Sequence, residues 1–529
     1  MEVRTVLLDG QHQQLCDIHS GISLPRQSRA TGQTAWGQHT RLIGRPTIAR
    51  ARAGCQETRQ RDRSRCLPSR CCAGSSPGAA KNRERGVPRP AVPGEPRRQD
   101  ALVDTAPAAP ASKYTCATPG RKPLIDVTKL FCGRDTTGDP IRYGHRRGPA
   151  HGNPHPTEGP AHAAPPSASD RRPVVAWNIC RRCNLACVHC YTDSANRHYP
   201  GELTTEEGMA LIDDLADFRI PALLFSGGEP LIRPDLFTLA AHARARNLRI
   251  TLSTNGTLID EAMAARIREA GFNYVGISLD GIGETNDRFR GMPGAFERAV
   301  RGIRNCMAVG QKVGLRLTLT RRNYQDLHAI FRFIEEEGIQ RACFYHLVYA
   351  GRGNDMTRDD LSHAETRRAM DIILEHTLDF HRRGLGIDIL TVDNHVDGPY
   401  LYLRLCQTDP KRAEEARRLL EWNGGGANSS GVGFGNIDPQ GNVHPDQFWQ
   451  QHTFGNVRER PFSEIWMDTT DPLMAGLKNR LPLLKGKCSR CRFLKMCGGS
   501  FRVRALAVTG DPWAPDPACY LTEEEISGE

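Results

Sequence analysis

The sequence contains no run of 18 apolar residues, and its first residues, MEVRTVLLDGQHQQ, include no apolar segment of signal-peptide length. We therefore expect neither a transmembrane helix nor export, and we predict a cytoplasmic protein. In that compartment the 18 cysteines are expected to be reduced or metal-bound, because a disulfide framework belongs to oxidising surroundings.

Aromatic residues are scarce near the N-terminus: residues 1–123 contain no Phe and only Trp36 and Tyr114. This segment holds 21 Lys and Arg against 9 Asp and Glu, so its net charge is +12 and that of the remainder is −1. The basic character thus gives the remainder no reason to bind nucleic acid or a membrane. Because a segment so poor in apolar pattern cannot offset its ordering entropy, we predict that it is disordered or a mis-assigned upstream extension.

From Pro173 onward, short apolar runs bounded by Gly, Asn or Pro alternate with amphipathic stretches. We predict six strands, over 174–177, 222–225, 249–253, 274–279, 313–319 and 342–348. Helices are expected between them, at 261–270, 295–309 and 324–337 among others, and Thr204 with Glu207 forms a capping box for the clearest one. This alternation predicts an α/β fold, a partial (β/α)6 barrel that is open on one side.

Polar or glycine-rich motifs follow the predicted strands, where chemistry gathers in folds of this kind. They are CRRCNLACVHC, SGGEP, STNG, SLDG and YHLVYAGRG. In the first motif, the spacing Cys183-x3-Cys187-x2-Cys190 supplies three thiolates, which leaves one iron of a four-iron cluster free. A structural zinc site also suits such spacing, but it gives no reason for the other motifs. Cys180 is expected to pack rather than to bind metal.

A second cysteine group stands near the C-terminus, as Cys488-x2-Cys491-x5-Cys497 followed by Cys519. Nearby cations, such as Lys487, favour thiolate over thiol and balance part of a cluster's negative charge. Considered alone, four cysteines also suit zinc. This group is therefore a second candidate metal site.

With Gly227-Gly228-Glu229-Pro230 behind the second strand, the first cysteine motif resembles the radical S-adenosylmethionine (SAM) superfamily over about residues 173–337. The resemblance implies a [4Fe–4S] cluster on Cys183, Cys187 and Cys190 that cleaves SAM, reduced by a donor such as a ferredoxin or flavodoxin. It also implies SAM contacts from the motifs at the strand ends, although each motif could simply form a tight turn. The implied contact residues are Tyr191, Gly227, Gly228, Glu229, Pro230, Ser253, Asn255, Ser278 and Asp280.

The C-terminal cysteines resemble those of SPASM or twitch domains, which bind auxiliary [4Fe–4S] clusters. The resemblance implies Cys488, Cys491, Cys497 and Cys519 as ligands. Many SPASM proteins carry a further cysteine after a segment of the form Ile-Asp-x-x-Gly-x-Val-x-Pro. Here residues 437–445 have that form but lead to Asp446, so we expect one auxiliary cluster rather than two.

Further stretches, including LIDVTKLFCG, DNHVDGPYLYLRL and GDPWAPDPACYL, resemble tetrapyrrole-modifying radical SAM enzymes over about residues 124–523. This resemblance implies removal of the acetate side chains of 12,18-didecarboxysiroheme, which gives iron-coproporphyrin III in alternative haem biosynthesis. Haem d1 chemistry on the same tetrapyrrole, decarboxylation of coproporphyrin propionates and SPASM-type peptide modification are the alternatives. A non-enzymatic zinc protein is the alternative from a different class.

Spacing assigns no residue to the substrate. His395 and His444 are candidates for the tetrapyrrole iron or a carboxylate, and Arg352, Arg458 or Arg460 could pair with carboxylates. We expect the following division of the chain: an extension at 1–123, a short segment and linker at 124–172, a radical SAM core at 173–385, a connecting region at 386–480 and an auxiliary-cluster domain at 481–529.

Overall fold

The protein is described by a computed structural model at residues 124–136 and 171–528. The predictions made for residues 1–123 lie outside the described residues, as does most of the predicted linker. All described residues belong to one compact unit. No helix among them is long and apolar enough to cross a membrane.

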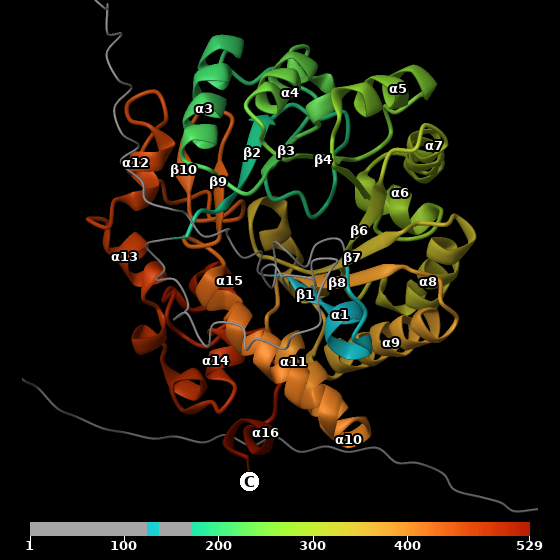
Figure 1. Cartoon of the computed structure of the whole chain (residues 1–529), viewed down its shortest axis with the longest axis vertical. Coiled ribbons are helices and arrows are strands. Elements are labelled where there is room, and N and C mark those ends of the chain that lie inside the picture. The colour runs from blue at the N-terminus through green and yellow to red at the C-terminus, as the bar shows by residue number, and fades with distance from the viewer. Residues whose placement is uncertain (1–123, 137–170, 529) are drawn as a thin grey trace, which may run out of the picture. The chain divides into compact units, whose positions relative to one another are not determined.

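The six predicted strands all form, and they line up in chain order in one sheet (Figure 1). Neighbouring strands are parallel throughout this series. The open barrel predicted from the alternation of strands and helices is therefore confirmed. The strands are β2 (Val174–Cys180), β3 (Leu223–Gly227), β4 (Ile250–Thr254), β5 (Tyr274–Ser278), β6 (Val313–Leu319) and β7 (Arg341–His346).

Two further pairs of strands, not foreseen from the sequence, extend this sheet at its edges. On one edge β8 (Asp388–Val392) runs parallel to β7, and β1 (Ile125–Asp126) pairs antiparallel with β8. On the other edge β9 (Phe434–Ile437) runs parallel to β2, and β10 (Val443–His444) pairs antiparallel with β9. The sheet therefore has ten strands and does not close.

Helices follow the strands and surround the outer side of the curved sheet (Figure 1). In α3 (Thr205–Asp217) the capping box predicted at Thr204 and Glu207 is present. The other core helices are α4 (Leu236–Ala245), α5 (Glu261–Ala270), α6 (Glu284–Arg290), α7 (Ala295–Ala308), α8 (Leu327–Glu336) and α9 (His363–Arg382), with short 3-10 helices η2 (Pro230–Ile232), η3 (Tyr324–Asp326) and η4 (Gly351–Asp359).

Further helices form the two ends of the described chain. The N-terminal α1 (Val127–Cys132) packs against α9 and α11. The C-terminal elements are α10 (Asp397–Thr408), α11 (Pro410–Asn423), η5 (Gly425–Asn428), α12 (Phe462–Met467), α13 (Pro472–Lys478), η6 (Leu481–Leu483), η7 (Gly486–Arg490), α14 (Leu494–Cys497), α15 (Arg502–Thr509) and α16 (Glu523–Ser527).

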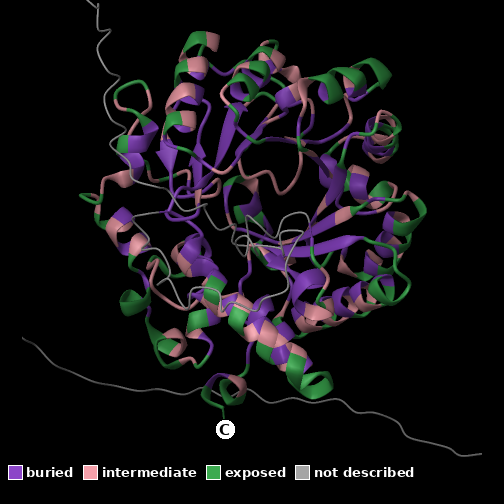
Figure 2. Cartoon of the chain, in the orientation of Figure 1, coloured by how far each residue is buried: buried purple, intermediate pink, exposed green. Residues whose placement is uncertain are grey.

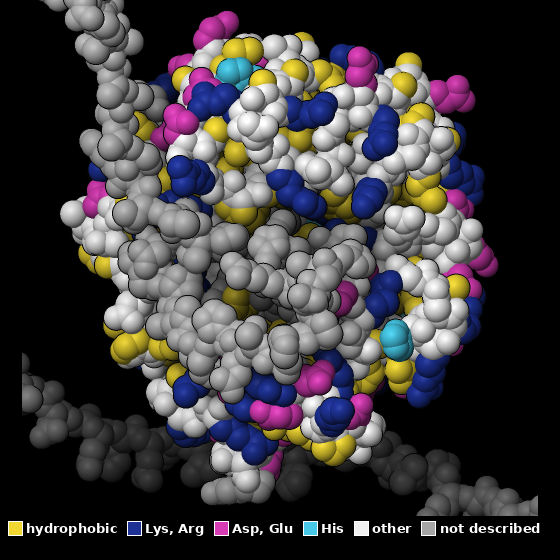
Figure 3. All heavy atoms as spheres, viewed as in Figure 1, with side chains coloured by type: hydrophobic (Ala, Val, Ile, Leu, Met, Phe, Trp, Pro, Cys, Tyr) yellow, Lys and Arg dark blue, Asp and Glu magenta, His cyan; other side chains and the backbone are white. Residues whose placement is uncertain are grey.

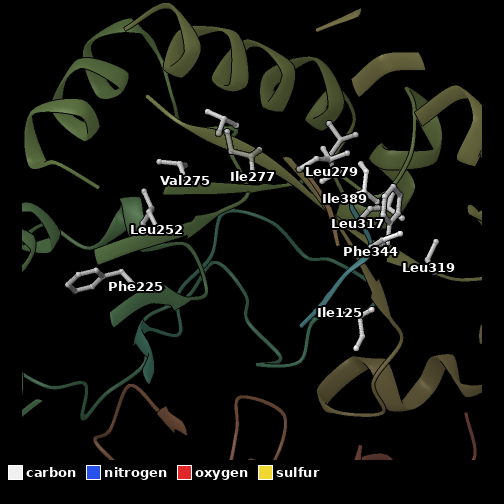
Figure 4. Packing of buried hydrophobic residues seen from close by; sticks show 14 of the residues in the cluster. Ile125, Phe225, Leu252, Val275, Ile277, Leu279, Leu317, Leu319, Phe344 and Ile389 are labelled. Atoms are coloured by element: carbon white, nitrogen blue, oxygen red, sulfur yellow. The ribbon is translucent and has the colours of Figure 1, made fainter. Parts of the chain in front are cut away.

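Alternation of side chains along the strands divides the sheet into a core face and a cavity face. Val275, Ile277 and Leu317 belong to one hydrophobic core with residues of the surrounding helices, and Figure 4 shows such side chains following the sheet from β3 to β8. Ser278 and Arg316, from the same strands, line a cavity instead. Figure 2 accordingly shows buried strands inside helices whose outer sides are exposed.

Candidate active site

A cavity lies at the carboxyl ends of the parallel strands. The loop after β2 contributes Cys183, Cys187 and Cys190 to its wall. Most of the predicted SAM-contact residues from the other strand ends join them, because parallel strands end at one edge of a sheet. These are Tyr191, Gly227, Gly228, Ser253, Asn255, Ser278 and Asp280.

Hydrogen-bond donors face all three thiols of the loop. The Leu185 N–H lies 3.4 Å from Cys183 Sγ, the Arg290 guanidinium 3.7 Å from Cys187 Sγ, and the Ser194 N–H 3.4 Å from Cys190 Sγ. Such donors stabilise sulfur that carries negative charge. Burial raises the pKa of the Cys183 thiol to about 12, so a bound metal, which would replace the proton, would be needed to make this sulfur a thiolate.

The three thiols border a shared space rather than a single point. Among the described residues, no three His, Cys, Asp or Glu side chains converge on one ion. A four-iron cluster does not need such convergence, because each thiolate binds a different iron. The loop therefore fits a cluster.

The Gly227-Gly228 pair packs directly against the cysteine loop. A Cβ on Gly227 would lie 2.3 Å from the Cys180 carbonyl oxygen, and one on Gly228 would lie 2.2 Å from that of Arg182. The Gly228 and Glu229 N–H groups donate to these same two oxygens. Only glycine permits this approach, so the pair has a structural task beside its predicted contact with SAM.

Glu229 and Pro230 are buried and do not line the cavity. The Glu229 carboxylate accepts hydrogen bonds from Leu231 N, Thr254 Oγ1 and Asn255 N, which tie the end of β3 to that of β4. Burial raises the pKa of Glu229 to about 7 despite these bonds. Its contact with the SAM amino group stays a prediction.

Asp280 organises the wall beside Cys187. Its Oδ2 lies 2.5 Å from the Arg290 guanidinium and 3.2 Å from His189 Nε2, and its Oδ1 accepts from the Thr318 N–H. Burial raises the pKa of Asp280, but Arg290 and His189 outweigh it and bring the value to about 2. Arg290 was missed from the sequence, because nothing near it in the chain distinguishes it from a surface arginine.

Tyr191 closes another part of the wall. Its hydroxyl lies 3.1 Å from Asn178 Oδ1 and 3.2 Å from Ser226 Oγ, and its ring packs edge-on against Phe448. The tyrosine is therefore held in place before any ligand binds. Its predicted position near the adenine of SAM remains a prediction.

None of the three substrate candidates from the sequence lines the cavity. His395 is buried, and neither ring nitrogen has a hydrogen-bond partner among the described residues. His444 Nδ1 lies 2.7 Å from the His452 carbonyl oxygen, and its Nε2 faces Asp438 at 3.4 Å. Arg352 donates to the Cys187 and Ser194 carbonyl oxygens from outside the loop.

The two further arginines considered for carboxylate binding are engaged elsewhere. The Arg458 guanidinium pairs with Glu207 at 2.7 Å, and that of Arg460 pairs with Asp468 at 2.8 Å. Neither residue lines the cavity.

Besides Arg290, several cavity residues were not among the site residues predicted from the sequence, among them Arg316, Tyr345, His346, Asp393, Gln447 and Phe448. Arg316 lies on β6, and its side chain passes over Gly276 of β5. A Cβ on Gly276 would lie 2.3 Å from the Arg316 Nε. The Arg316 Nη1 then donates to Ser253 Oγ at 2.5 Å. A charged residue inside an apolar strand pattern, as Arg316 in VGLRLTL, is a signal that could have indicated this wall.

The four C-terminal cysteines also meet in one place. Cys488, Cys491, Cys497 and Cys519 line a second, smaller cavity, together with Lys487 and apolar side chains such as Leu494. Arg502 is fully buried within electrostatic reach of Cys488 and Cys497. The convergence of four cysteines separated by up to 31 residues suits an iron–sulfur cluster.

Asp446 stands where many SPASM domains have another cysteine. It is buried, does not line the auxiliary cavity, and accepts hydrogen bonds from Ser430 Oγ and from the N–H groups of Phe448 and Trp449. The side chain therefore fixes a turn.

Comparisons with known proteins agree with this arrangement. The radical SAM superfamily model matches residues 177–334, and the model of the SPASM iron–sulfur cluster-binding domain matches residues 433–492. Fe-coproporphyrin III synthase of Methanosarcina barkeri is 55% identical over 406 residues, which cover 76% of this chain and 99% of that protein. Pre-heme d1 synthase of Dinoroseobacter shibae is 47% identical over a region that covers 69% of this chain and 90% of that protein.

A solved structure shares the fold at much lower sequence similarity. Streptococcus suis SuiB bound to S-adenosylmethionine is 19% identical, with a TM-score of 0.52 over 66% of this chain and 78% of that chain. The domain matches imply SAM, a [4Fe–4S] cluster and an auxiliary iron–sulfur cluster as cofactors. The chain is a radical SAM enzyme with a SPASM domain, and it belongs to the tetrapyrrole-modifying branch of that family.

Proposed function

We propose that this enzyme removes the acetate side chains of 12,18-didecarboxysiroheme and yields iron-coproporphyrin III. The observation that carries the proposal is the 55% identity to Fe-coproporphyrin III synthase over 99% of that protein's length. An identity of this size along both domains makes a shared substrate class the natural expectation. A ferredoxin or flavodoxin is the proposed electron donor.

In this proposal Cys183, Cys187 and Cys190 hold the cluster that binds SAM, and Cys488, Cys491, Cys497 and Cys519 hold the auxiliary cluster. SAM held at the first cluster would supply the radical chemistry of the reaction. Tyr191, Ser253, Asn255, Ser278 and Asp280 position SAM from the strand ends. The remaining polar wall of the cavity, which includes Arg316 and Asp393, receives the macrocycle and its carboxylate arms.

Haem d1 biosynthesis is the second candidate, because pre-heme d1 synthase is 47% identical over 90% of its length. The two reactions are distinguished by the side chains that the product retains. The identity to Fe-coproporphyrin III synthase is higher and spans more of the chain, which favours acetate removal.

The test uses the full chain, reconstituted anaerobically with iron and sulfide and supplied with SAM, dithionite and didecarboxysiroheme. We expect stepwise loss of two acetate arms by mass spectrometry, with iron-coproporphyrin III as the final product. The Cys183→Ala variant serves as the control and should form neither product nor deoxyadenosine. Deoxyadenosine from the wild type with a different tetrapyrrole product would favour the haem d1 reaction and reject the deacetylase.

A further inference from the structure

Asp393 follows β8 in a backbone conformation that few residues adopt. Its φ is +66°, and it is one of five non-glycine residues with positive φ among those described. The Arg504 guanidinium holds its carbonyl oxygen at 2.8 Å, and Arg504 is itself fixed by Asp516 at 2.8 Å. Such strain persists only where surrounding contacts impose it, and it gathers at functional sites.

The Asp393 carboxyl lines the active-site cavity. Its Oδ2 is buried and has no hydrogen-bond partner among the described residues. Burial raises the pKa of this carboxyl to about 7. A buried polar atom without a partner needs an explanation, and here the adjoining cavity offers one: the partner is a ligand.

Arg316 presents the complementary feature in the same cavity. Its side chain is half-buried, with Nε fully enclosed, and donates to Ser253 Oγ, but in the described part of the chain it forms no ion pair with a carboxylate. Its Nε has no hydrogen-bond partner there either. A partly buried cation without a counter-ion is costly unless a ligand supplies the negative charge.

We propose that Asp393 and Arg316 form a subsite for one carboxylate arm of the tetrapyrrole. Arg316 supplies the positive charge, and Asp393 donates a hydrogen bond from its protonated carboxyl to the arm. The inference rests on the proposed function, because the carboxylate arm belongs to the proposed substrate. It goes further by assigning two residues to the recognition of that substrate.

The charged groups around Asp393 set the pH range of this bond. Arg316 on β6, His346 on β7, Arg504 on α15 and Asp446 after β10 all act on its titration. Above a pH of about 7 the carboxyl loses its proton and repels the substrate arm, so tetrapyrrole affinity should fall. In the Asp393→Asn variant the amide side chain keeps a hydrogen-bond donor and does not titrate. The affinity of this variant for the tetrapyrrole should therefore not change across this pH range.

The experiment titrates didecarboxysiroheme into the reconstituted full chain and follows binding by absorbance. Asp393→Gly removes the carboxyl without backbone strain, because glycine tolerates positive φ. We expect Asp393→Gly to weaken binding on the order of tenfold, as does the loss of one hydrogen bond to a charged group. Asp393→Asn should bind about as tightly as the wild type, and Arg316→Met should bind more weakly than either.

Deoxyadenosine formation without tetrapyrrole shows in each variant that the clusters and the SAM site are intact. Wild-type affinity in Asp393→Gly would overturn the Asp393 assignment, and weak binding in Asp393→Asn would overturn its role as a donor. Loss of SAM cleavage in Arg316→Met would assign Arg316 to SAM instead. If the wild-type enzyme binds didecarboxysiroheme but does not remove the acetate arms of this tetrapyrrole, the proposed function is rejected, while the comparison of binding among the variants stays valid. If the wild-type enzyme does not bind didecarboxysiroheme, both the proposed function and the subsite are overturned.

Discussion

Cys180 and Cys183 lie three residues apart, yet they have different surroundings. The Cys180 thiol points away from the cavity and lies 3.4 Å from the Glu229 carbonyl oxygen, to which it can donate. Burial raises its pKa to about 12. Cys183 faces the cavity and receives donors instead. Cys180 is therefore packed against the segment that follows β3, and metal binding by Cys183 stays a prediction.

This difference predicts opposite results for two similar substitutions. Cys183→Ala should lose the first cluster, retain roughly half of the iron bound by the wild type, and form no deoxyadenosine. Cys180→Ala should retain full iron content and cleave SAM, with a loss of stability of about 1 kcal/mol or somewhat more from the small cavity it leaves. Iron analysis and deoxyadenosine assays check both. A wild-type iron content in Cys183→Ala would contradict the ligand assignment.

His395 is buried in a site that favours its neutral form. Burial lowers its pKa to about 3, with a further contribution from Arg480. The unfolded histidine takes up a proton below a pH of about 6.5, but the folded one does not, so His395 reduces stability as the pH falls through that value. Its position outside the cavity gives it no contact with a substrate there.

We therefore expect His395→Leu to bind the tetrapyrrole with unchanged affinity. Relative to the wild type, the variant should gain about 2 kcal/mol of stability between pH 7 and pH 5, because it removes the cost of keeping the ring unprotonated. Thermal unfolding at both pH values and a binding titration measure the two effects. A large loss of affinity would restore His395 as a substrate residue.

At the scale of elements, most of the strands that could be predicted from the sequence are those whose own residues show an apolar run between turn residues. The strands from β2 to β7 are apolar runs bounded by turn residues, and their predicted ends lie within three residues of those observed. β8 was missed although it is as long as β3, whereas the missed strands β1 and β10 are only two residues long and β9 carries Asn436 within four residues. Runs so short show no periodicity, and their partners lie far away in the chain.

The same reason explains which cavity residues were missed. Motif residues such as Cys183 and Asn255 carry a local signature. Asp393 depends on Arg504, which is 111 residues away, and the cavity position of Arg316 depends on Gly276 of the neighbouring strand. No local pattern records such contacts, so they became visible only in the folded chain.

Arg352 links η4 to the cysteine loop. Its Nε donates to the Cys187 carbonyl oxygen at 2.7 Å, and its Nη1 donates to Asp193 at 2.7 Å and to the Ser194 carbonyl oxygen at 2.9 Å. The backbone N–H of Arg352 also donates to the Cys190 carbonyl oxygen. The guanidinium therefore holds the loop from behind, where it can fix the spacing of the three thiols.

We expect Arg352→Ala to release iron from the first cluster faster than the wild type when a chelator is added, with unchanged tetrapyrrole affinity. Arg458→Ala is the matched control, because Arg458 also bridges a carboxylate and backbone oxygens but lies away from the loop. Iron release over time distinguishes the two. An Arg352→Ala variant with stable iron and weakened tetrapyrrole binding would instead support the carboxylate-binding role considered from the sequence.

At the scale of the molecule, the C-terminal domain shapes the substrate cavity as well as the auxiliary site. Besides Arg504, which holds the Asp393 carbonyl oxygen, Asn394 donates to the Ala518 carbonyl oxygen at 3.0 Å. Tyr520, next to Cys519, donates to Asp397 at 2.7 Å, and Asp397 in turn contacts His346 in the cavity wall. On the face shown in Figure 3, basic and acidic side chains are interspersed.

This coupling predicts the effect of removing the auxiliary cluster. Cys497→Ala should keep the first cluster and form deoxyadenosine, but it should bind the tetrapyrrole more weakly, because loosening residues 497–520 loosens the segment that carries Asp393. Cys406→Ala, at an exposed cysteine, is the control and should match the wild type. Iron content, deoxyadenosine formation and absorbance titration are measured on the same samples. Unchanged affinity in Cys497→Ala, with its auxiliary iron gone, would mean that protein contacts alone hold the Asp393 segment and that the cluster serves electron transfer only.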